Sequence, residues 1–195
     1  GSTREIVTFC MRFKPTKDDT IVILGDVGAN YFGDFRDNKL KEAFAKLEPT
    51  IFCIHGNHEM RPWNIPTYKI KEWNGGTVWY EEKYPNILFA KDGEIFDIEG
   101  TKHLVIGGAY SVDKFYRLSR GYGWWEDEQP SEEIKLYVEQ QIKEKEFDVI
   151  LSHTCPFKYE PIETFLPGID QSTVDTSTEE WLDKIEELVD YKAWY

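Results

Sequence analysis

The chain has 195 residues, of which 41% are hydrophobic and 15% aromatic, so it is long enough to form one domain with a substantial core. Its 36 acidic residues outnumber its 23 basic residues, and the net charge of -13 disfavours an extended nucleic acid as a partner. No run approaches the roughly 20 apolar residues of a membrane span, and no signal-peptide layout opens the chain, so we expect no membrane association.

The three cysteines, Cys10, Cys53 and Cys155, are odd in number and widely spaced. This pattern predicts neither a disulfide framework nor a thiolate zinc site, and reduced cytoplasm is the expected location. Internal repeats and a convincing interdomain linker are both lacking. We therefore expect residues 1–195 to form a single domain.

The N-terminal segment predicts a helix followed by a strand. Ser2 and Glu5 have the spacing of a capping box, which predicts a helix from there to about Phe13. Residues 21–24 form a continuous apolar run, as expected for a strand that is buried on both faces. Gly25 and Asp26 follow this strand directly.

The same order of elements then repeats. Apolar residues at helical spacing predict a helix over residues 37–47, which ends before Pro49. Residues 51–54 form a second buried strand, and the polar sequence from His55 to Glu59 follows it. Asn57 and His58 therefore lie at a strand end, as Asp26 does.

The middle of the chain has a different hydrophobic pattern. Short alternating segments separated by turn residues predict an antiparallel meander over residues 76–109. Its expected strands are residues 77–80, 87–90, 94–98 and 103–106.

The last third returns to helices and buried strands. We predict helices over residues 131–146 and about 178–189, and the opening of a strand at 192–195. Residues 147–151 form a third buried strand, which ends at Ser152 and His153. Mixed strands and helices of this kind indicate an α/β sandwich.

Three predicted strand ends thus carry polar side chains that can bind a metal ion. They are Asp26, Asn57 with His58, and His153. Open α/β sheets place ligand sites beyond the carboxyl ends of their strands, where these residues would meet. A carboxylate, an amide oxygen and an imidazole suit Mn, Fe or Zn, and a carboxylate such as Asp26 can bridge two divalent ions. The adjacent glycines, Gly25 and Gly56, permit close backbone approach.

These motifs resemble those of the calcineurin-like metallophosphoesterases. Gly25-Asp26-Val27-Gly28 resembles the second motif of that family, Gly56-Asn57-His58-Glu59 its third, and Ser152-His153 the motif that follows. The resemblance covers nearly the whole chain from Ile21 onward. It implies an α/β sandwich of two mixed β-sheets flanked by helices, and a hydrolase in which two metal ions activate a hydroxide that attacks a phosphate ester.

The resemblance also implies roles for individual residues. Asp26 would bridge two metal ions, and Asn57 and His153 would bind the second of them. His58 would protonate the leaving oxygen or stabilise the transition state, and Glu59 would orient His58.

Reasoning from the residues adds two supporting positions. We expect His55, one residue before the motif, to hydrogen-bond to a metal ligand or to be a partly buried imidazole, rather than to bind metal itself. Arg117 is a candidate for gripping the substrate phosphate, although an ordinary surface ion pair explains it nearly as well.

Two departures from the family pattern leave alternatives open. The D-x-H and G-H-x-H motifs are missing, so we expect the natural protein to be longer at both ends and this chain to hold a weakened site. Residues 28–30 lack the Asp-Arg pair of serine/threonine phosphatases, which puts that activity in doubt. A phosphomonoesterase or phosphodiesterase acting on a small or nucleotide-like substrate is expected, and the alternative is an inactive scaffold or binding module that retains the fold.

Overall fold

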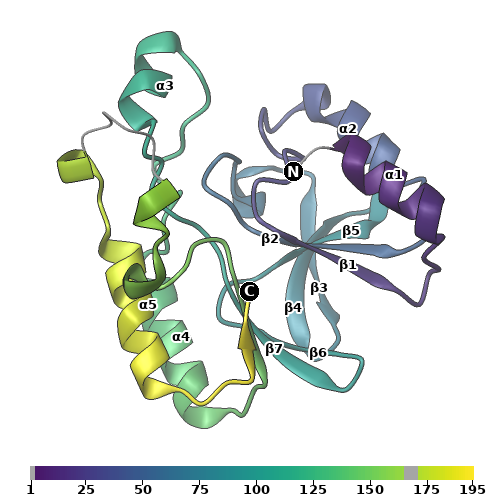
Figure 1. Ribbon diagram of the computed structural model, residues 1–195. Coiled ribbons are helices and arrows are strands. Elements are labelled where there is room, and N and C mark those ends of the chain that lie inside the picture. The colour runs from purple at the N-terminus through teal and green to yellow at the C-terminus, as the bar shows by residue number, and fades with distance from the viewer. Residues whose placement is uncertain (1–2, 165–170) are drawn as a thin grey trace.

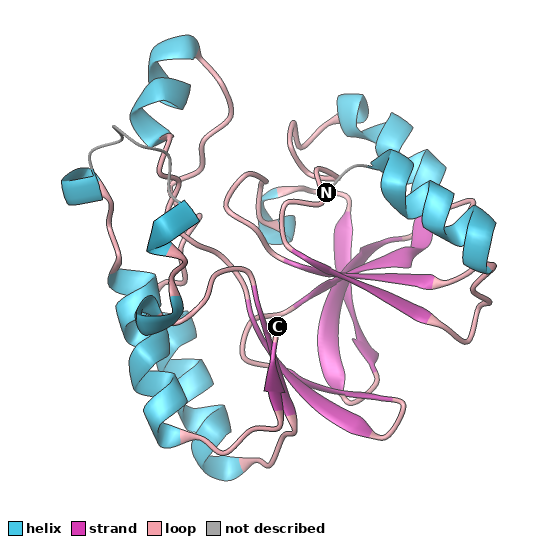
Figure 2. Cartoon of the chain, viewed as in Figure 1, coloured by secondary structure: helices cyan, strands magenta, loops and turns pink. Residues whose placement is uncertain are grey.

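Two β-sheets lie face to face between outer layers of helices in the computed structural model, which describes residues 3–164 and 171–195 (Figure 1). Its strands are β1 (Thr20–Leu24), β2 (Thr50–Ile54), β3 (Tyr68–Trp73), β4 (Gly76–Glu81), β5 (Tyr84–Ala90), β6 (Ile95–Ile98), β7 (Thr101–Ile106), β8 (Val149–Ser152) and β9 (Ala193–Trp194). Its α-helices are α1 (Thr3–Phe13), α2 (Asn38–Phe44), α3 (Lys114–Arg120), α4 (Glu132–Glu144) and α5 (Ser177–Leu188). The predicted sandwich of two mixed sheets flanked by helices is confirmed (Figure 2).

The first sheet has the strand order β1-β2-β5-β4-β3. Its strands β1, β2 and β5 are parallel, with Leu24 opposite Ile54 at the ends of β1 and β2. Parallel pairing brings the carboxyl ends of these strands to one edge of the sheet. The residues that follow β1 and β2 are therefore neighbours.

The second sheet has the strand order β6-β7-β8-β9, in which β7, β8 and β9 are parallel. This arrangement corrects the predicted meander, because β5 belongs to the first sheet, where it pairs in parallel with β2, whereas β6 and β7 form an antiparallel pair in the second. The turn at Asp92 and Gly93 carries the chain from one sheet to the other. The sequence of this turn is that of an ordinary hairpin turn, so the sequence does not indicate that the chain passes from one sheet to the other here.

Alternate residues of β2 show how the first sheet packs. Ile51 and Cys53 face the helix layer and share a core cluster with Phe44 of α2, while Phe52 and Ile54 face the second sheet. Both faces of β2 are buried, as its apolar run predicts.

The far side of the second sheet is covered by α4 and α5. Leu104 of β7 and Ile150 of β8 belong to one buried cluster with Val138 of α4 and Leu182 of α5. The two helices therefore cover the outer face of the second sheet, while Ile6 of α1 and Phe44 of α2 pack against part of the first.

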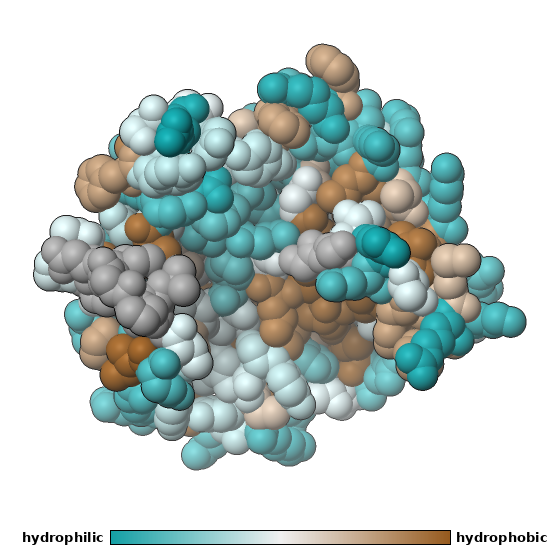
Figure 3. All heavy atoms as spheres, turned by 45° about the horizontal axis from the view of Figure 1, so that its top comes forward, coloured by the Kyte–Doolittle hydropathy of each residue, from teal (hydrophilic) through white to brown (hydrophobic). Residues whose placement is uncertain are grey.

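Strand β1 differs from its prediction. Its residues Ile21 and Ile23 pack against the core cluster under the helices, but Val22 and Leu24 are 36% and 37% exposed. The reason is that the core between the two sheets includes residues of β2, β4 and β5 but none of β1. Apolar side chains reach the surface near the middle of one face of the molecule (Figure 3).

The predicted helices are found with shifted ends, and two elements were not predicted. The capping residue Ser2 lies outside the described residues. Strand β3 lies at an edge, and its Ile70 is exposed, while α3 stands apart from the sheets (Figure 1) and has no buried residue. Among the described residues, none of the helices is both long and apolar enough to span a bilayer.

Candidate active site

The side chains of Asp26, Asn57, His58 and His153 meet at the carboxyl ends of three strands. Asp26 follows β1, Asn57 and His58 follow β2, and His153 follows β8 of the second sheet. His153 Nε2 lies 2.9 Å from Asn57 Oδ1 and 3.7 Å from Asp26 Oδ1. The structure thus brings together residues that are up to 127 positions apart in the printed sequence (153 − 26 = 127).

Asp26 occupies a backbone conformation that non-glycine residues rarely adopt. Its φ of 51° is in the left-handed region, and its Oδ1 accepts a hydrogen bond of 2.9 Å from the amide of His58. Burial alone would raise the pKa of Asp26, but the hydrogen bonds from His58 outweigh burial, and the pKa falls to about 2. A Cβ at Gly56 would lie 2.2 Å from Asp26 Oδ1, so the position requires glycine.

The imidazole of His153 is held in one tautomer. Its Nδ1 lies 2.7 Å from the carbonyl oxygen of Leu24, which can only accept, so Nδ1 carries the proton and Nε2 has a free lone pair. Gly25 permits this approach, because a Cβ there would lie 1.9 Å from His153 Nδ1. The backbone at the end of β1 therefore orients a ligand nitrogen from the other sheet.

The amide of Asn57 is oriented by a hydrogen-bonded chain that the sequence did not predict. Ser111 Oγ donates to Glu128 Oε2 at 2.5 Å, and it accepts from Asn57 Nδ2 at 3.0 Å. Glu128 and Ser111 are both buried. Because the Asn57 nitrogen is committed to Ser111, its Oδ1 faces His153.

This geometry fits a bound cation. In the neutral form of His153, the lone pairs of Nε2 and of Asn57 Oδ1 face each other across 2.9 Å with no proton between them. A divalent ion that accepts both lone pairs, with Asp26 Oδ1 nearby, would relieve this contact. Within the described residues, no cluster of three or more His, Cys, Asp and Glu side chains is arranged for metal, so the set depends on the amide of Asn57.

His58 lies between two carboxylates. Its Nδ1 is 3.3 Å from Asp26 Oδ2, and its Nε2 is 3.3 Å from Asp113 Oδ1. The hydrogen bond to Asp26 raises the pKa of His58, which favours the protonated ring. The side chain is about one-third exposed, but its Nε2 is buried and has no hydrogen-bond partner among the described residues.

Arg117 approaches this site through Asp113. Its Nε donates to both carboxylate oxygens of Asp113 at 2.8 and 2.9 Å, and its Nη1 donates to the carbonyl oxygen of Gly123 at 2.9 Å. The guanidinium therefore holds Asp113 in place next to His58. Gripping of a phosphate by Arg117 remains a proposal.

Glu59 and His55 are both buried next to the site. Glu59 is fully buried, and its Oε1 accepts from the amide of Gly56 at 3.2 Å, so it supports the turn rather than the ring of His58. Burial raises the pKa of Glu59 to about 8. Neither ring nitrogen of His55 has a hydrogen-bond partner among the described residues, and burial holds its pKa well below the usual range. His55 is thus a neutral core residue.

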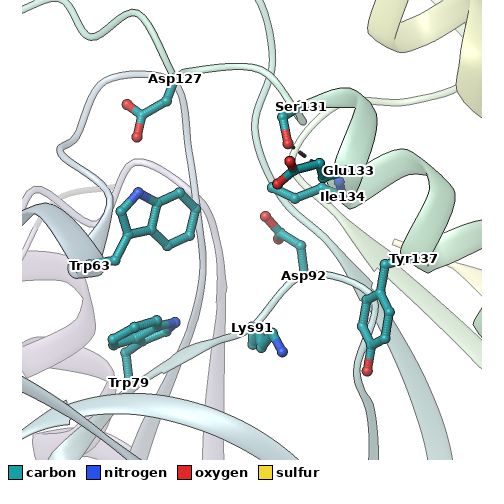
Figure 4. Close-up of a pocket in the computed structure, with 9 residues that line it drawn as sticks. All are labelled: Trp63, Trp79, Lys91, Asp92, Asp127, Ser131, Glu133, Ile134 and Tyr137. Atoms are coloured by element: carbon teal, nitrogen blue, oxygen red, sulfur yellow. Dashed lines mark hydrogen bonds between the residues drawn. The ribbon is translucent and has the colours of Figure 1, made fainter.

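Two cavities of similar size are candidates for holding a substrate. Asn57 and His153 line a cavity of about 510 Å³ whose walls also include Phe157 and Glu179. A second cavity, of about 520 Å³, lies between Trp63 and Trp79 on one side and Tyr137 on the other (Figure 4). The second cavity contains none of the strand-end residues, so the first is the candidate substrate cavity.

Replacing Ser111 with Ala removes the hydrogen bond that orients Asn57. We expect the affinity for Mn²⁺ to fall by about 10- to 100-fold, because groups that orient metal ligands contribute on this scale. Titration calorimetry on the Ser111→Ala chain measures the effect, and Ser119→Ala, an exposed serine of α3, is the matched control. An unchanged affinity for Mn²⁺ in Ser111→Ala would contradict the assigned orientation of Asn57.

Comparison with known proteins gives one match. The model of the calcineurin-like phosphoesterase family matches residues 1–191. The curated proteins and the solved structures include no match to this chain.

Proposed function

Because the chain belongs to the calcineurin-like phosphoesterase family, we propose that it is a metal-dependent hydrolase of phosphate esters whose site is the cluster at the three strand ends. The observation that carries this proposal is the 2.9 Å contact between His153 Nε2 and Asn57 Oδ1, two atoms that both present lone pairs when His153 is neutral. Two acceptors in contact repel each other, whereas a cation bound by both of them removes the conflict.

Three side chains would hold the metal ions. Asn57 and His153 would bind one ion together, and Asp26 would bridge it to a second, which matches the two ions typical of the family. When bound, divalent ions polarise the phosphoryl group and lower the pKa of water toward neutrality. The three donors make up part of a two-metal site.

The protein's own acid would be His58. Its raised pKa keeps a proton on the ring. Nδ1 faces Asp26, whereas Nε2 is buried and has no hydrogen-bond partner among the described residues, so Nε2 is the atom from which a substrate in the site would take that proton. Asp113 faces Nε2, and Arg117 keeps Asp113 in position. The ring would therefore be oriented for proton transfer without a contact from Glu59.

The expected substrate is a small or nucleotide-like phosphate monoester or diester. A cavity of about 510 Å³ suits such a molecule, and the net charge of -13 disfavours an extended polyanion. The absence of the Asp-Arg pair at residues 28–30 places a serine/threonine phosphatase second.

Hydrolysis of para-nitrophenyl phosphate and of its bis ester tests the proposal. We expect turnover by the full-length protein to require added Mn²⁺ and to stop with a chelator. The ratio of the two rates distinguishes a monoesterase from a diesterase, and a phosphoserine peptide tests the second candidate. No turnover of any of these compounds, with Mn²⁺ bound, would favour the inactive scaffold.

A further inference from the structure

The substrate cavity contains a buried carboxylate with an unused acceptor. Glu179, on α5, is only 7% exposed and lines the cavity together with Asn57 and His153. Its Oε2 has no hydrogen-bond partner among the described residues. A buried acceptor left unpaired costs free energy, so a rotation of the Glu179 side chain that turns this atom toward the cavity would be favoured by a donor that a ligand brings.

The charges around Glu179 favour a cation. Glu160 and Asp175 line the same cavity, and none of the described residues in its lining is Lys or Arg. The carboxylate of Asp175 is already occupied, because it accepts from Gln129 Nε2 and from the amide of Ser177, both at 3.0 Å. Burial raises the pKa of Glu179, and the carboxylates of Glu160 and Asp175 act in the same direction, whereas the hydroxyl of Thr154 and the amide of Glu179 lower it in part. A bound cation would offset this repulsion.

Part of the cavity wall is apolar. Val112, Phe157 and Ile162 line it, and their side chains are exposed to solvent. Exposed apolar side chains in a concave wall gain free energy when an apolar group covers them. The cavity therefore combines an apolar wall, an acidic end and the proposed metal ligands.

We infer that the substrate is a phosphate ester whose leaving group joins an apolar body to a primary ammonium group, with the ammonium bound by Glu179. This inference rests on the proposed function, because it assigns the phosphate to the end of the cavity at Asn57 and His153. A primary ammonium is favoured over a quaternary one because it brings three N–H donors, one of which can satisfy Glu179 Oε2.

Binding of tyramine and of 4-propylphenol tests the ammonium site without any turnover, because the two compounds differ only by a methyl group in place of the ammonium. We expect calorimetry to give at least about tenfold tighter binding of tyramine, the scale of a hydrogen bond to a charged group. In Glu179→Gln, which keeps the shape of the side chain, the preference should fall to near unity.

Two variants with the charge removed elsewhere are controls. Glu187→Gln removes a charge from an exposed position of the same helix, and Glu133→Gln removes one from the second cavity (Figure 4). Both should keep the preference for tyramine. Equal binding of the two compounds by the wild type, or loss of the preference in Glu133→Gln but not in Glu179→Gln, would overturn the inference.

Turnover separates this inference from the proposed function. With Mn²⁺, tyramine phosphate should have a higher kcat/KM than 4-propylphenyl phosphate, and Glu179→Gln should lose most of that difference. If tyramine binds through Glu179 but neither ester is hydrolysed, the ammonium site stands and the proposed function is wrong. If both esters are hydrolysed equally and tyramine is not preferred, the function stands and the ammonium site is wrong.

Discussion

The Asp26→Asn variant should lower kcat/KM for para-nitrophenyl phosphate by about 10³-fold, because it removes the one negative charge proposed to bridge two cations. The amide retains an oxygen, but it cannot offset the repulsion between two divalent ions. The measurement is steady-state kinetics at saturating Mn²⁺, together with the affinity for Mn²⁺ of each protein.

Asn is the substitution that removes the charge of Asp26 without changing the backbone conformation. Asp26 has a φ of 51°, and Asn is among the residues that tolerate the left-handed region best, so the variant should keep the turn. Its thermal midpoint should stay close to that of the wild type. Asp18→Asn, at an exposed position, is the matched control and should keep full activity. Activity of Asp26→Asn within a factor of a few of the wild type would exclude the bridging role.

The His58→Gln variant should have an effect that depends on the leaving group. We expect a loss of about 10² to 10⁴ in kcat for an alkyl phosphate, whose departing alkoxide needs a proton, and a much smaller loss for para-nitrophenyl phosphate. Metal affinity should change little, because His58 contacts Asp26 and Asp113 rather than supplying a proposed ligand atom.

The comparison of two leaving groups distinguishes an acid from a structural residue. A general loss of structure or of metal would reduce the hydrolysis of both esters by the same factor. Equal losses for the alkyl and the para-nitrophenyl ester would therefore rule out proton donation by His58. His103→Gln, at a position on β7 far along the chain from the motif, is the control for loss of an imidazole.

The strand ends were predictable because their signals are local. Buried parallel strands are continuous apolar runs, and glycine next to a polar residue indicates a sharp turn with close approach. The contacts at Gly25 and Gly56 are of this kind, since a Cβ at either would overlap His153 or Asp26. Sequence alone therefore located the cluster of Asp26, Asn57 and His153.

The supporting residues were not predictable, because they act over long separations in the sequence. Asn57 is oriented by Ser111, 54 positions away, and Ser111 by Glu128, 17 positions further on. Neither residue follows a strand directly, so no local pattern marks it. Glu59 shows the converse, since its place beside His58 in the sequence suggested a contact, whereas its hydrogen bond goes to Gly56.

Two elements, β3 and α3, were not predicted from the sequence, and the reasons differ. Strand β3 does alternate apolar and charged residues, from Tyr68 through Lys71, so a signal was present but not used. Helix α3 is only seven residues long and has no buried residue, and its apolar Phe115 and Leu118 are exposed, so its apolar pattern is too short to indicate a helix that packs on the core.

Pulsed electron paramagnetic resonance of bound Mn²⁺ tests the central claim, that these strand ends form a metal site. The imidazole nitrogen of His153 should modulate the Mn²⁺ signal of the wild type, and His153→Gln should lose that modulation while His58→Gln keeps it. A Mn²⁺ signal without nitrogen modulation in the wild type, or modulation that persists in His153→Gln, would contradict the assignment of His153 and with it the proposed metal site.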